Sequence, residues 1–336
     1  MMARALALNG ALKVYIVGRR KEVLEKASKS VSTNNIIPLV GDVTSKEALA
    51  SLVSQIASEV GYINVLIANS GTLGPQPAQK ITSESTVADY QKAWGETSFE
   101  DFADTFNLNT VAVWFTIVAF LGLLDAGNKK GNLEQKSQVI ATSSIGSFNR
   151  NVPGGFAYGQ SKAATTHMMK QLATNLAPLG IRSNILAPGC KFSFQINCSM
   201  GLRKFQDTSR KFALGHVSYV ILNRFWPLFW TCLTILNLTW IVFPSELAAG
   251  IIGDGVFSRA QIPLERVGTE EDMAGCILFL TSRAGAYLTG NVMLIDGGRL
   301  SMVPATYWKI CSNEEFRVLK QGKVIRKTIR MLVPLI

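Results

Sequence analysis

Short apolar segments alternate with helix-forming segments along most of this chain, and this alternation constrains the fold more than any other feature of the sequence. A strand, a helix and a second strand in succession almost always form a right-handed parallel unit with the helix packed on the sheet. The pattern therefore predicts a Rossmann-like, doubly wound α/β fold with a mostly parallel sheet. The expected strands are 14–17, 36–40, 65–67, 138–142, 182–186 and 292–295, and the expected helices are 1–11, 21–28, 49–60, 102–124, 158–176 and 272–280.

The excess of positive charge lies in two segments and not in the body of the chain. The net charge is +11, and residues 190–241 and 307–336 each carry five more basic than acidic side chains. A basic face for nucleic acid is therefore not expected on the body of the protein. We predict a single domain over residues 1–306, interrupted by an insertion at 190–241 and followed by a basic C-terminal extension at 307–336.

The insertion contains a strongly apolar segment at 217–243, in which no residue from Phe225 to Phe243 is charged. This run is long enough to cross a membrane, so association with a membrane through 217–243 is one alternative. Pro227 and Asn237 weaken it, and a buried hairpin is a second alternative. A third hypothesis is a faulty gene model with a retained intron, because the segment lacks amphipathic order.

Cysteine and histidine usage limits the compartment and the metal chemistry. Five cysteines without close pairing favour neither a disulfide framework nor a zinc site, and they fit a reducing, cytoplasmic location. Only two histidines are present, with no carboxylate cluster around them, so no metal site is expected.

Candidate catalytic residues follow the expected strand 138–142. Tyr158 and Lys162 are four residues apart on a predicted helix, which places them on one face, and Ser144 follows the end of the strand. Reduction of a carbonyl requires an acid that supplies a proton and a donor that holds the developing oxyanion. A nearby ammonium lowers the pKa of a phenol, so Lys162 would make Tyr158 usable as that acid. These residues predict a small-molecule carbonyl or alcohol as substrate.

With these three residues the chain resembles the short-chain dehydrogenase/reductase family, and its 3-oxoacyl-thioester reductases most closely. The resemblance implies transfer of hydride between a nicotinamide cofactor and a ketone or alcohol, such as an oxoacyl or polyketide-like carbonyl in secondary metabolism. It also implies a homo-oligomer, formed through the helix that carries Tyr158. Further segments agree with the family, namely Asn109, Gly41-Asp42-Val43, Ala68-Asn69-Ser70-Gly71, Pro188-Gly189 and Asp296-Gly297-Gly298.

The resemblance assigns roles to these positions. It implies that Asn109 organises a proton-relay water and is catalytic with Ser144, Tyr158 and Lys162. The cofactor-binding residues that it implies are Asp42 and Val43 near the adenine, Asn69 and Gly71 in the turn after a strand, Pro188 and Gly189 beside the nicotinamide, and Tyr158 and Lys162 themselves.

The choice of cofactor is predicted from the end of the strand 14–17. Arg19 and Arg20 follow it directly, and no acidic residue stands there. An arginine at this place accommodates the 2′-phosphate of NADP, whereas NAD enzymes place an acid on the ribose hydroxyl. The sequence therefore favours NADP(H) as cofactor.

Two departures from the family remain as expectations. The family's first strand and its glycine-rich phosphate loop are expected to be missing, which would expose the edges of the neighbouring strands. A catalytically impaired binding or scaffold protein is therefore the alternative function. The spacing of Ser144 to Tyr158 is one residue longer than is usual in the family, so Ser143 or Ser147 is an alternative for the serine role.

Overall fold

The computed structural model describes residues 1–82, 84–150, 154–189, 257, 259 and 262–302. All of them belong to one compact unit, Met1–Met302. The predicted insertion at 190–241, the segment 217–243 and the extension at 307–336 lie outside the described residues.

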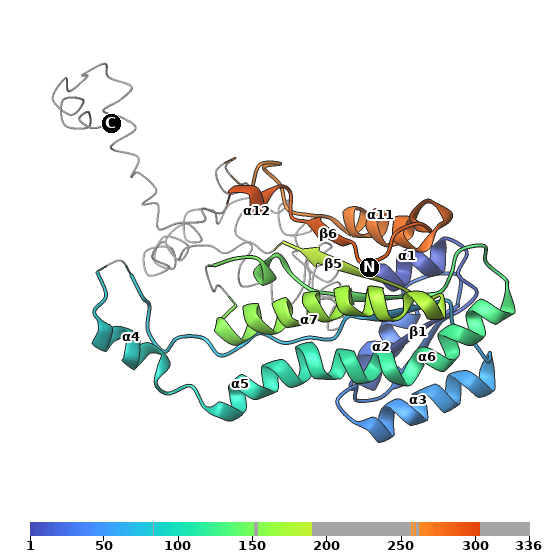
Figure 1. The fold of residues 1–336 in the computed structure, drawn as a ribbon, viewed down its shortest axis with the longest axis horizontal. Coiled ribbons are helices and arrows are strands. Elements are labelled where there is room, and N and C mark those ends of the chain that lie inside the picture. Colours follow the sequence, from blue (N-terminus) through green and yellow to red (C-terminus); the bar gives the residue numbers. More distant parts are fainter. Residues whose placement is uncertain (83, 151–153, 190–256, 258, 260–261, 303–336) are drawn as a thin grey trace, which may run out of the picture. The chain divides into compact units, whose positions relative to one another are not determined.

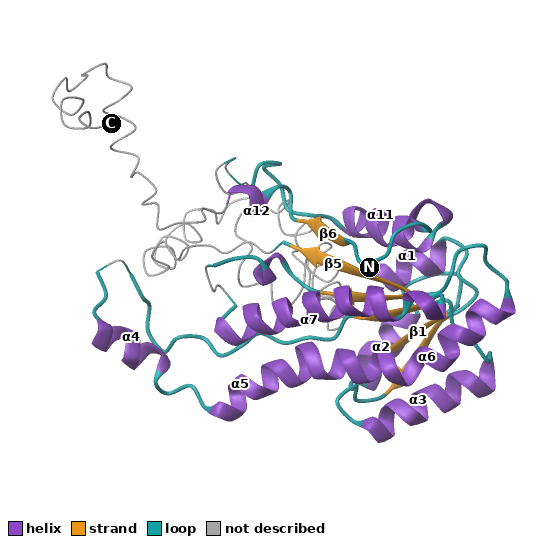
Figure 2. Cartoon of the chain, in the orientation of Figure 1, coloured by secondary structure: helices purple, strands orange, loops and turns teal. Residues whose placement is uncertain are grey.

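In the described part of the chain, six parallel strands form two sheets, and strands are drawn in orange in Figure 2. All six lie where the apolar runs predict them, and their ends differ from the prediction by at most two residues, so the predicted α/β class is confirmed. Pairing runs β1–β2 in one sheet and β3–β4–β5–β6 in the other. The strands are β1 (Val14–Gly18), β2 (Ile36–Val40), β3 (Val65–Ala68), β4 (Gln138–Thr142), β5 (Arg182–Pro188) and β6 (Val292–Ile295).

Helices cover both faces of these sheets (Figure 1). Several begin with a side-chain cap, as where Ser45 Oγ accepts a hydrogen bond from the Ala48 amide. The helices are α1 (Met2–Leu8), α2 (Lys21–Ser28), α3 (Lys46–Glu59), α4 (Val87–Trp94), α5 (Phe99–Phe106), α6 (Ala112–Lys130), α7 (Phe156–Asn175), α11 (Glu270–Thr281) and α12 (Arg299–Met302), with a π-helical turn at Asn107–Val111 between α5 and α6.

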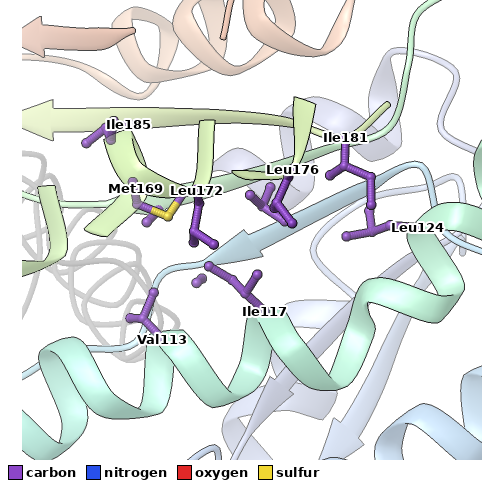
Figure 3. Packing of buried hydrophobic residues seen from close by; sticks show 11 residues of the cluster. Val113, Ile117, Leu124, Met169, Leu172, Leu176, Ile181 and Ile185 are labelled. Atoms are coloured by element: carbon purple, nitrogen blue, oxygen red, sulfur yellow. The ribbon is translucent and has the colours of Figure 1, made fainter. Parts of the chain in front are cut away.

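One apolar core joins α6 and α7 to a face of the larger sheet (Figure 3). Ile117 and Leu124 of α6 and Met169 of α7 are fully buried against Val139 and Ile185 of the sheet. The opposite face is covered by α1 and α11, whose side chains pack on Ile140 and Leu186. Alternate residues of each buried strand therefore meet helices on opposite faces, which is the doubly wound arrangement.

A cavity of about 820 Å³ lies between the two sheets, with β1 on one side and β3 on the other. One face of this interstrand cavity is closed by α1 and the other by α3 and α6, whose lining residues include Leu49, Leu52 and Phe120. In the described chain β1 bonds only to β2, and β3 only to β4. The edges of β1 and β3 thus face each other across this partly open cavity.

The helical region Phe99–Lys130 is long and apolar enough to cross a membrane by length and composition alone. Its α6 part forms the core against the sheet, so its apolar character has a structural reason.

The sequence-based helix prediction differs from the structure at several places, including the start of α3 at Lys46 and the unpredicted short helix α12. The expected helix 102–124 is two α-helices separated by the π-helical turn, and it extends from Phe99 to Lys130. The opening helix ends at Leu8, three residues before the prediction. Helix α4 was not predicted, because it is short and its apolar side is hardly buried, Ala93 being its one buried residue.

Candidate active site

The end of β4 and the first turns of α7 bring the predicted catalytic residues to one edge of the larger sheet. Strand β4 ends at Thr142, and Ser143 and Ser144 continue it into a short 3₁₀ turn at Ile145–Ser147. In an open parallel sheet the crevice at the carboxyl ends of the strands is where ligands bind. These residues therefore lie at the place where this fold class forms its sites.

The three neighbouring serines have different surroundings. Ser143 Oγ donates to the Lys162 carbonyl oxygen and lies 2.6 Å from Thr166 Oγ1, so it holds α7 against the sheet. Ser147 Oγ donates to the Ser144 carbonyl oxygen. Ser144 Oγ accepts a hydrogen bond from the Gly146 amide at 3.0 Å, which leaves its own proton for another acceptor. The geometry thus favours Ser144 over both alternatives for a hydroxyl that donates to a ligand.

Two glycines bring Tyr158 close to Ser144. A Cβ atom added to Gly146 would lie 3.2 Å from Tyr158 Cε1 and 3.3 Å from Ser144 Oγ, so both groups flank the same backbone. A Cβ atom on Gly154 would lie 2.5 Å from the Tyr158 ring. Any larger residue at these positions would displace the ring, and the glycines therefore fix where the phenol lies.

Lys162 is buried on the same face of α7, and its exposed fraction is 1%. Its Nζ donates to the Thr142 carbonyl oxygen at 2.9 Å, at the end of β4. Burial lowers the pKa of Lys162 to about 8. Thr142 is its one acceptor among the described residues, so two further N–H donors of this buried cation can contact a ligand at this edge.

Asn109 lies in the π-helical turn and is completely buried. Its side-chain Nδ2 donates to the Thr72 carbonyl oxygen at 2.9 Å, and its Oδ1 accepts from the Thr72 amide at 2.8 Å. This pair of bonds ties the loop after β3 to the helix. π-Helical turns are frequent at functional sites because they direct a residue out of the regular helical register.

Residues that the sequence reasoning missed connect these groups. Ser161 Oγ accepts from Asn109 Nδ2 at 2.9 Å and donates to the Tyr158 carbonyl oxygen at 2.9 Å. Thr165 Oγ1 donates to the main-chain oxygen of Asn109 at 2.6 Å. Both residues lie within one turn of Lys162, and their small polar side chains on the buried face of a helix were the available signal.

The predicted cofactor residues at β1 and β2 form a second, more exposed group. Arg19 follows β1, and its guanidinium lies 3.9 Å from the carboxylate of Asp42, which follows β2. Hydrogen bonds from Thr44, together with the Arg19 charge, hold the pKa of Asp42 below its ordinary value. No acid directly follows β1 in the sequence, and the neighbouring parallel strand places the Asp42 carboxylate beside Arg19. Arg20 adjoins this pair as the N-cap of α2, while Val43 packs in the apolar cluster of α3.

The remaining predicted cofactor residues lie at the turns after β3 and β5. Asn69 Oδ1 accepts a hydrogen bond from Thr142 Oγ1 at 2.7 Å, which joins the ends of β3 and β4. A Cβ atom on Gly71 would lie 2.9 Å from Asn109 Oδ1 and 3.1 Å from Lys162 Nζ. A Cβ atom on Gly189, after Pro188, would lie 2.3 Å from Asp296 Cβ. At both glycines the backbone packs directly against neighbouring groups, so a larger residue would disturb the sheet edge.

This donor set fits a phosphorylated dinucleotide. Arginines at one end suit phosphate, and the buried polar donors at the other end suit a ring with an amide substituent. Within the described residues, no group of three or more His, Cys, Asp or Glu side chains is placed to hold a metal ion.

Comparisons with known proteins agree with this arrangement. The family model described as short chain dehydrogenase matches residues 1–193, and the model described as Enoyl-(Acyl carrier protein) reductase matches residues 250–299. The chain belongs to the short-chain dehydrogenase/reductase family, and it is an oxidoreductase.

Named relatives and a solved structure extend this result. Short-chain dehydrogenase/reductase PhomF of Diaporthe leptostromiformis is 43% identical over 314 residues, which cover 91% of this chain and 89% of the relative. The rhamnolipids biosynthesis 3-oxoacyl-[acyl-carrier-protein] reductase of Pseudomonas aeruginosa is 24% identical and covers 89% and 90% of the two chains. The structure titled Pseudomonas aeruginosa RhlG/NADP active-site complex is similar in fold, with a TM-score of 0.58, 23% identity and coverage of 89% and 91%.

Proposed function

We propose that this chain interconverts a ketone and an alcohol with NADP(H), and that the ketone is an oxoacyl or polyketide-like carbonyl of secondary metabolism. The observation that carries the proposal is the clustering of Ser144, Tyr158 and buried Lys162 at the carboxyl edge of the sheet. An oxoacyl substrate is supported by the name of the Pseudomonas aeruginosa relative.

In the proposed reaction NADPH, when bound, supplies a hydride to the carbonyl carbon. Tyr158 transfers its phenolic proton to the carbonyl oxygen, so the product is an alcohol and the tyrosine is left as a phenolate. Ser144 donates a hydrogen bond to the same oxygen while negative charge develops on it. The Lys162 ammonium stabilises the phenolate, and a water held near Asn109 returns the proton.

NADPH is proposed over NADH because Arg19 and Arg20 lie at the end of β1. The pair between Arg19 and Asp42 is solvent-exposed and long, so it is a weak competitor for a phosphate. A bidentate guanidinium–phosphate contact is stronger than such a pair. The RhlG/NADP complex supports the same choice for a protein of similar fold.

The proposal also includes a cytoplasmic homo-oligomer. Trp114 and Val118 of α6 are 42% and 44% exposed, and exposed apolar side chains on neighbouring turns of a helix suit a contact between subunits. Association would be measured by light scattering of the purified chain, with Trp114→Glu as the variant expected to weaken it.

The test is oxidation of NADPH by acetoacetyl-CoA, followed at the nicotinamide absorbance. We expect turnover by the chain, and we expect Tyr158→Phe to lower kcat by about 100-fold to 10,000-fold because the proton donor is lost. Tyr287→Phe is the matched control, since Tyr287 is fully exposed. NADPH binding without turnover of this or other ketones would favour the binding-protein alternative instead.

A further inference from the structure

The π-helical turn contacts α7 through hydroxyl groups. Ser161 and Thr165 of α7 are four residues apart, so they lie on one face of the helix, and both are completely buried. Ser161 Oγ accepts a hydrogen bond from Asn109 Nδ2, and Thr165 Oγ1 donates to the main-chain oxygen of Asn109. Thr110, the next residue of the turn, donates from Oγ1 to the Ser161 carbonyl oxygen at 2.9 Å. Hydrogen bonds are directional and apolar contacts are not, so these bonds set how the turn and the helix fit together.

The Thr165 hydroxyl bonds more closely to the turn than to its own helix. Its one proton has three acceptors within reach, namely the Asn109 main-chain oxygen at 2.6 Å, the Ser161 carbonyl oxygen at 3.0 Å and Thr110 Oγ1 at 3.3 Å. A threonine within a helix ordinarily donates to the carbonyl oxygen four residues before it. Thr105 of α5 does so, at 3.1 Å. The shorter contact to Asn109 therefore assigns the Thr165 proton to the junction of the two segments.

The side chain of Asn109 has little hydrogen-bonding capacity left. Its Nδ2 gives its two protons to the Thr72 carbonyl oxygen and Ser161 Oγ, and its Oδ1 accepts from the Thr72 amide. Oδ1 therefore retains one acceptor position. A Cβ atom on Gly71 would lie 2.9 Å from Asn109 Oδ1 and 3.1 Å from Lys162 Nζ. These two polar atoms flank the same point, although they belong to different helical segments.

We propose that Thr165 is a positioning residue for the return of the proton to Tyr158. Its hydroxyl holds the main chain of Asn109 at the position along α7 where Asn109 Oδ1 and Lys162 Nζ flank one point. The inference rests on the proposed function, in which Lys162 and a water near Asn109 act once the hydride has been transferred. Thr165 is completely buried, so it acts through Asn109 and not on the cofactor or the ketone.

This role predicts which kinetic constant changes. Binding of NADPH depends on groups at the sheet edge, whereas return of the proton depends on the separation of Asn109 and Lys162. A misplacement of about 1 Å can slow a step by about 100-fold. Loss of the Thr165 hydroxyl is therefore expected to lower kcat by about tenfold and to leave the dissociation constant of NADPH unchanged. The solvent isotope effect on kcat is expected to increase, because return of the proton becomes the slow step.

The test compares Thr165→Val with Thr165→Ser in the oxidation of NADPH by acetoacetyl-CoA, in H₂O and in D₂O. Valine keeps the shape of threonine without the hydroxyl, whereas serine keeps the hydroxyl and loses a methyl group. We expect the valine variant to show the lower kcat and the larger isotope effect, and the serine variant to recover the wild-type values. A role in packing alone predicts that the serine variant is impaired as well, because it loses a buried methyl group.

Thr105→Val is the matched control. Thr105 is also buried, and its hydroxyl donates to the Asp101 carbonyl oxygen within its own helix. This variant loses a buried hydroxyl without affecting the contact between Asn109 and α7, so its kcat and isotope effect should equal those of the wild-type chain.

Three outcomes would overturn this inference alone. They are a wild-type kcat in Thr165→Val, an equal loss in the valine and serine variants, and a slowed valine variant whose isotope effect is unchanged. If Thr165→Val fails to fold, Thr165→Cys takes its place, because a thiol is a weak donor and the same loss is expected. No turnover of any ketone by the wild-type chain would instead overturn the proposed function, and this inference with it.

Discussion

The two ends of the candidate active site differ in how the protein prepares them. At the catalytic end, Lys162 and Asn109 are buried, and each makes hydrogen bonds that fix its position. At the cofactor-selecting end, the Arg19 side chain is 78% exposed and lies 3.9 Å from the Asp42 carboxylate. The comparison teaches that the groups near the reacting atoms are preorganised by the fold, whereas the group that would select the phosphate depends on the ligand to order it.

The largest expected effect is at Lys162. Replacement by methionine, Lys162→Met, is expected to lower kcat/KM for ketone reduction by about 100-fold or more, because the cation beside the proton donor is lost. Lys170→Met, on the exposed side of the same helix, is the control. Retention of more than a tenth of the activity by Lys162→Met would contradict the proposed catalytic role.

Lys162→Met is also expected to change the free energy of unfolding, and the size of this change depends on pH. The pKa of Lys162 is about 8 in the folded chain and 10.5 ordinarily, so the unfolded chain binds more protons between these values and stability rises with pH there. We expect the wild-type chain to gain about 3 kcal/mol relative to Lys162→Met between pH 7 and pH 10.5. Urea unfolding of both proteins at the two pH values measures this gain. A constant difference in the free energy of unfolding would show that burial does not lower the pKa of Lys162.

The next effect is structural, at Asn109. Asn109→Ala leaves the Thr72 amide and carbonyl without their partners, which is expected to cost about 2–4 kcal/mol of the free energy of unfolding. Asn175→Ala is the control, because its side chain bonds within its own exposed helix end. Equal stability of the two variants would show that the catalytic end is less rigid than the hydrogen bonds indicate.

A smaller effect is expected at the selecting end. Arg19→Ala is expected to lower kcat/KM for NADPH by about tenfold while leaving that for NADH unchanged, because only NADPH carries the 2′-phosphate. Arg283→Ala, which removes another exposed guanidinium, should change neither value. An equal loss with both cofactors would assign Arg19 to general positioning and not to selection.

The smallest effect is at Asp42. Asp42→Asn keeps an oxygen for the Thr44 bonds, so stability near neutral pH should change by less than about 0.5 kcal/mol. The lowered pKa of Asp42 means that its carboxylate stabilises the fold above its ordinary pKa and ceases to do so as the pH falls through the folded value. The difference between the two proteins should therefore be constant above about pH 5 and change only in stronger acid, as followed by unfolding at a series of pH values.

Much of the fold was predictable because continuous apolar runs mark buried parallel strands, as in β4 and β5. Helix α4 was missed because its apolar side is hardly buried, although Thr86 and Asp89 form a capping box that the sequence displays. The π-helical turn was not predictable in this way, since nothing in the pattern of residues 107–111 marks the one extra residue of such a turn.

The site was predictable where sequence spacing alone sets geometry, as for Tyr158 and Lys162 on one helix. It was not predictable where neighbouring strands bring residues together, and the approach of Asp42 to Arg19 is the example. The structure also distinguishes the roles of Ser143 and Ser144. The Ser143 hydroxyl is bonded to α7, whereas the Ser144 hydroxyl accepts only from the Gly146 amide among the bonds described.

Because of the π-helical turn at Asn107–Val111, the number of residues in this helical region determines where Asn109 points. An α-helix advances by about 100° for each residue, so deleting one residue here would permit regular bonding throughout and rotate α5 relative to α6 by about that angle. The shorter helix would gain regular hydrogen bonds, while Asn109 or the core face of α6 would lose its direction. A single-residue deletion would therefore make the helix more regular but would turn Asn109 away from its present position. This family member keeps the less regular helix together with the correctly oriented asparagine.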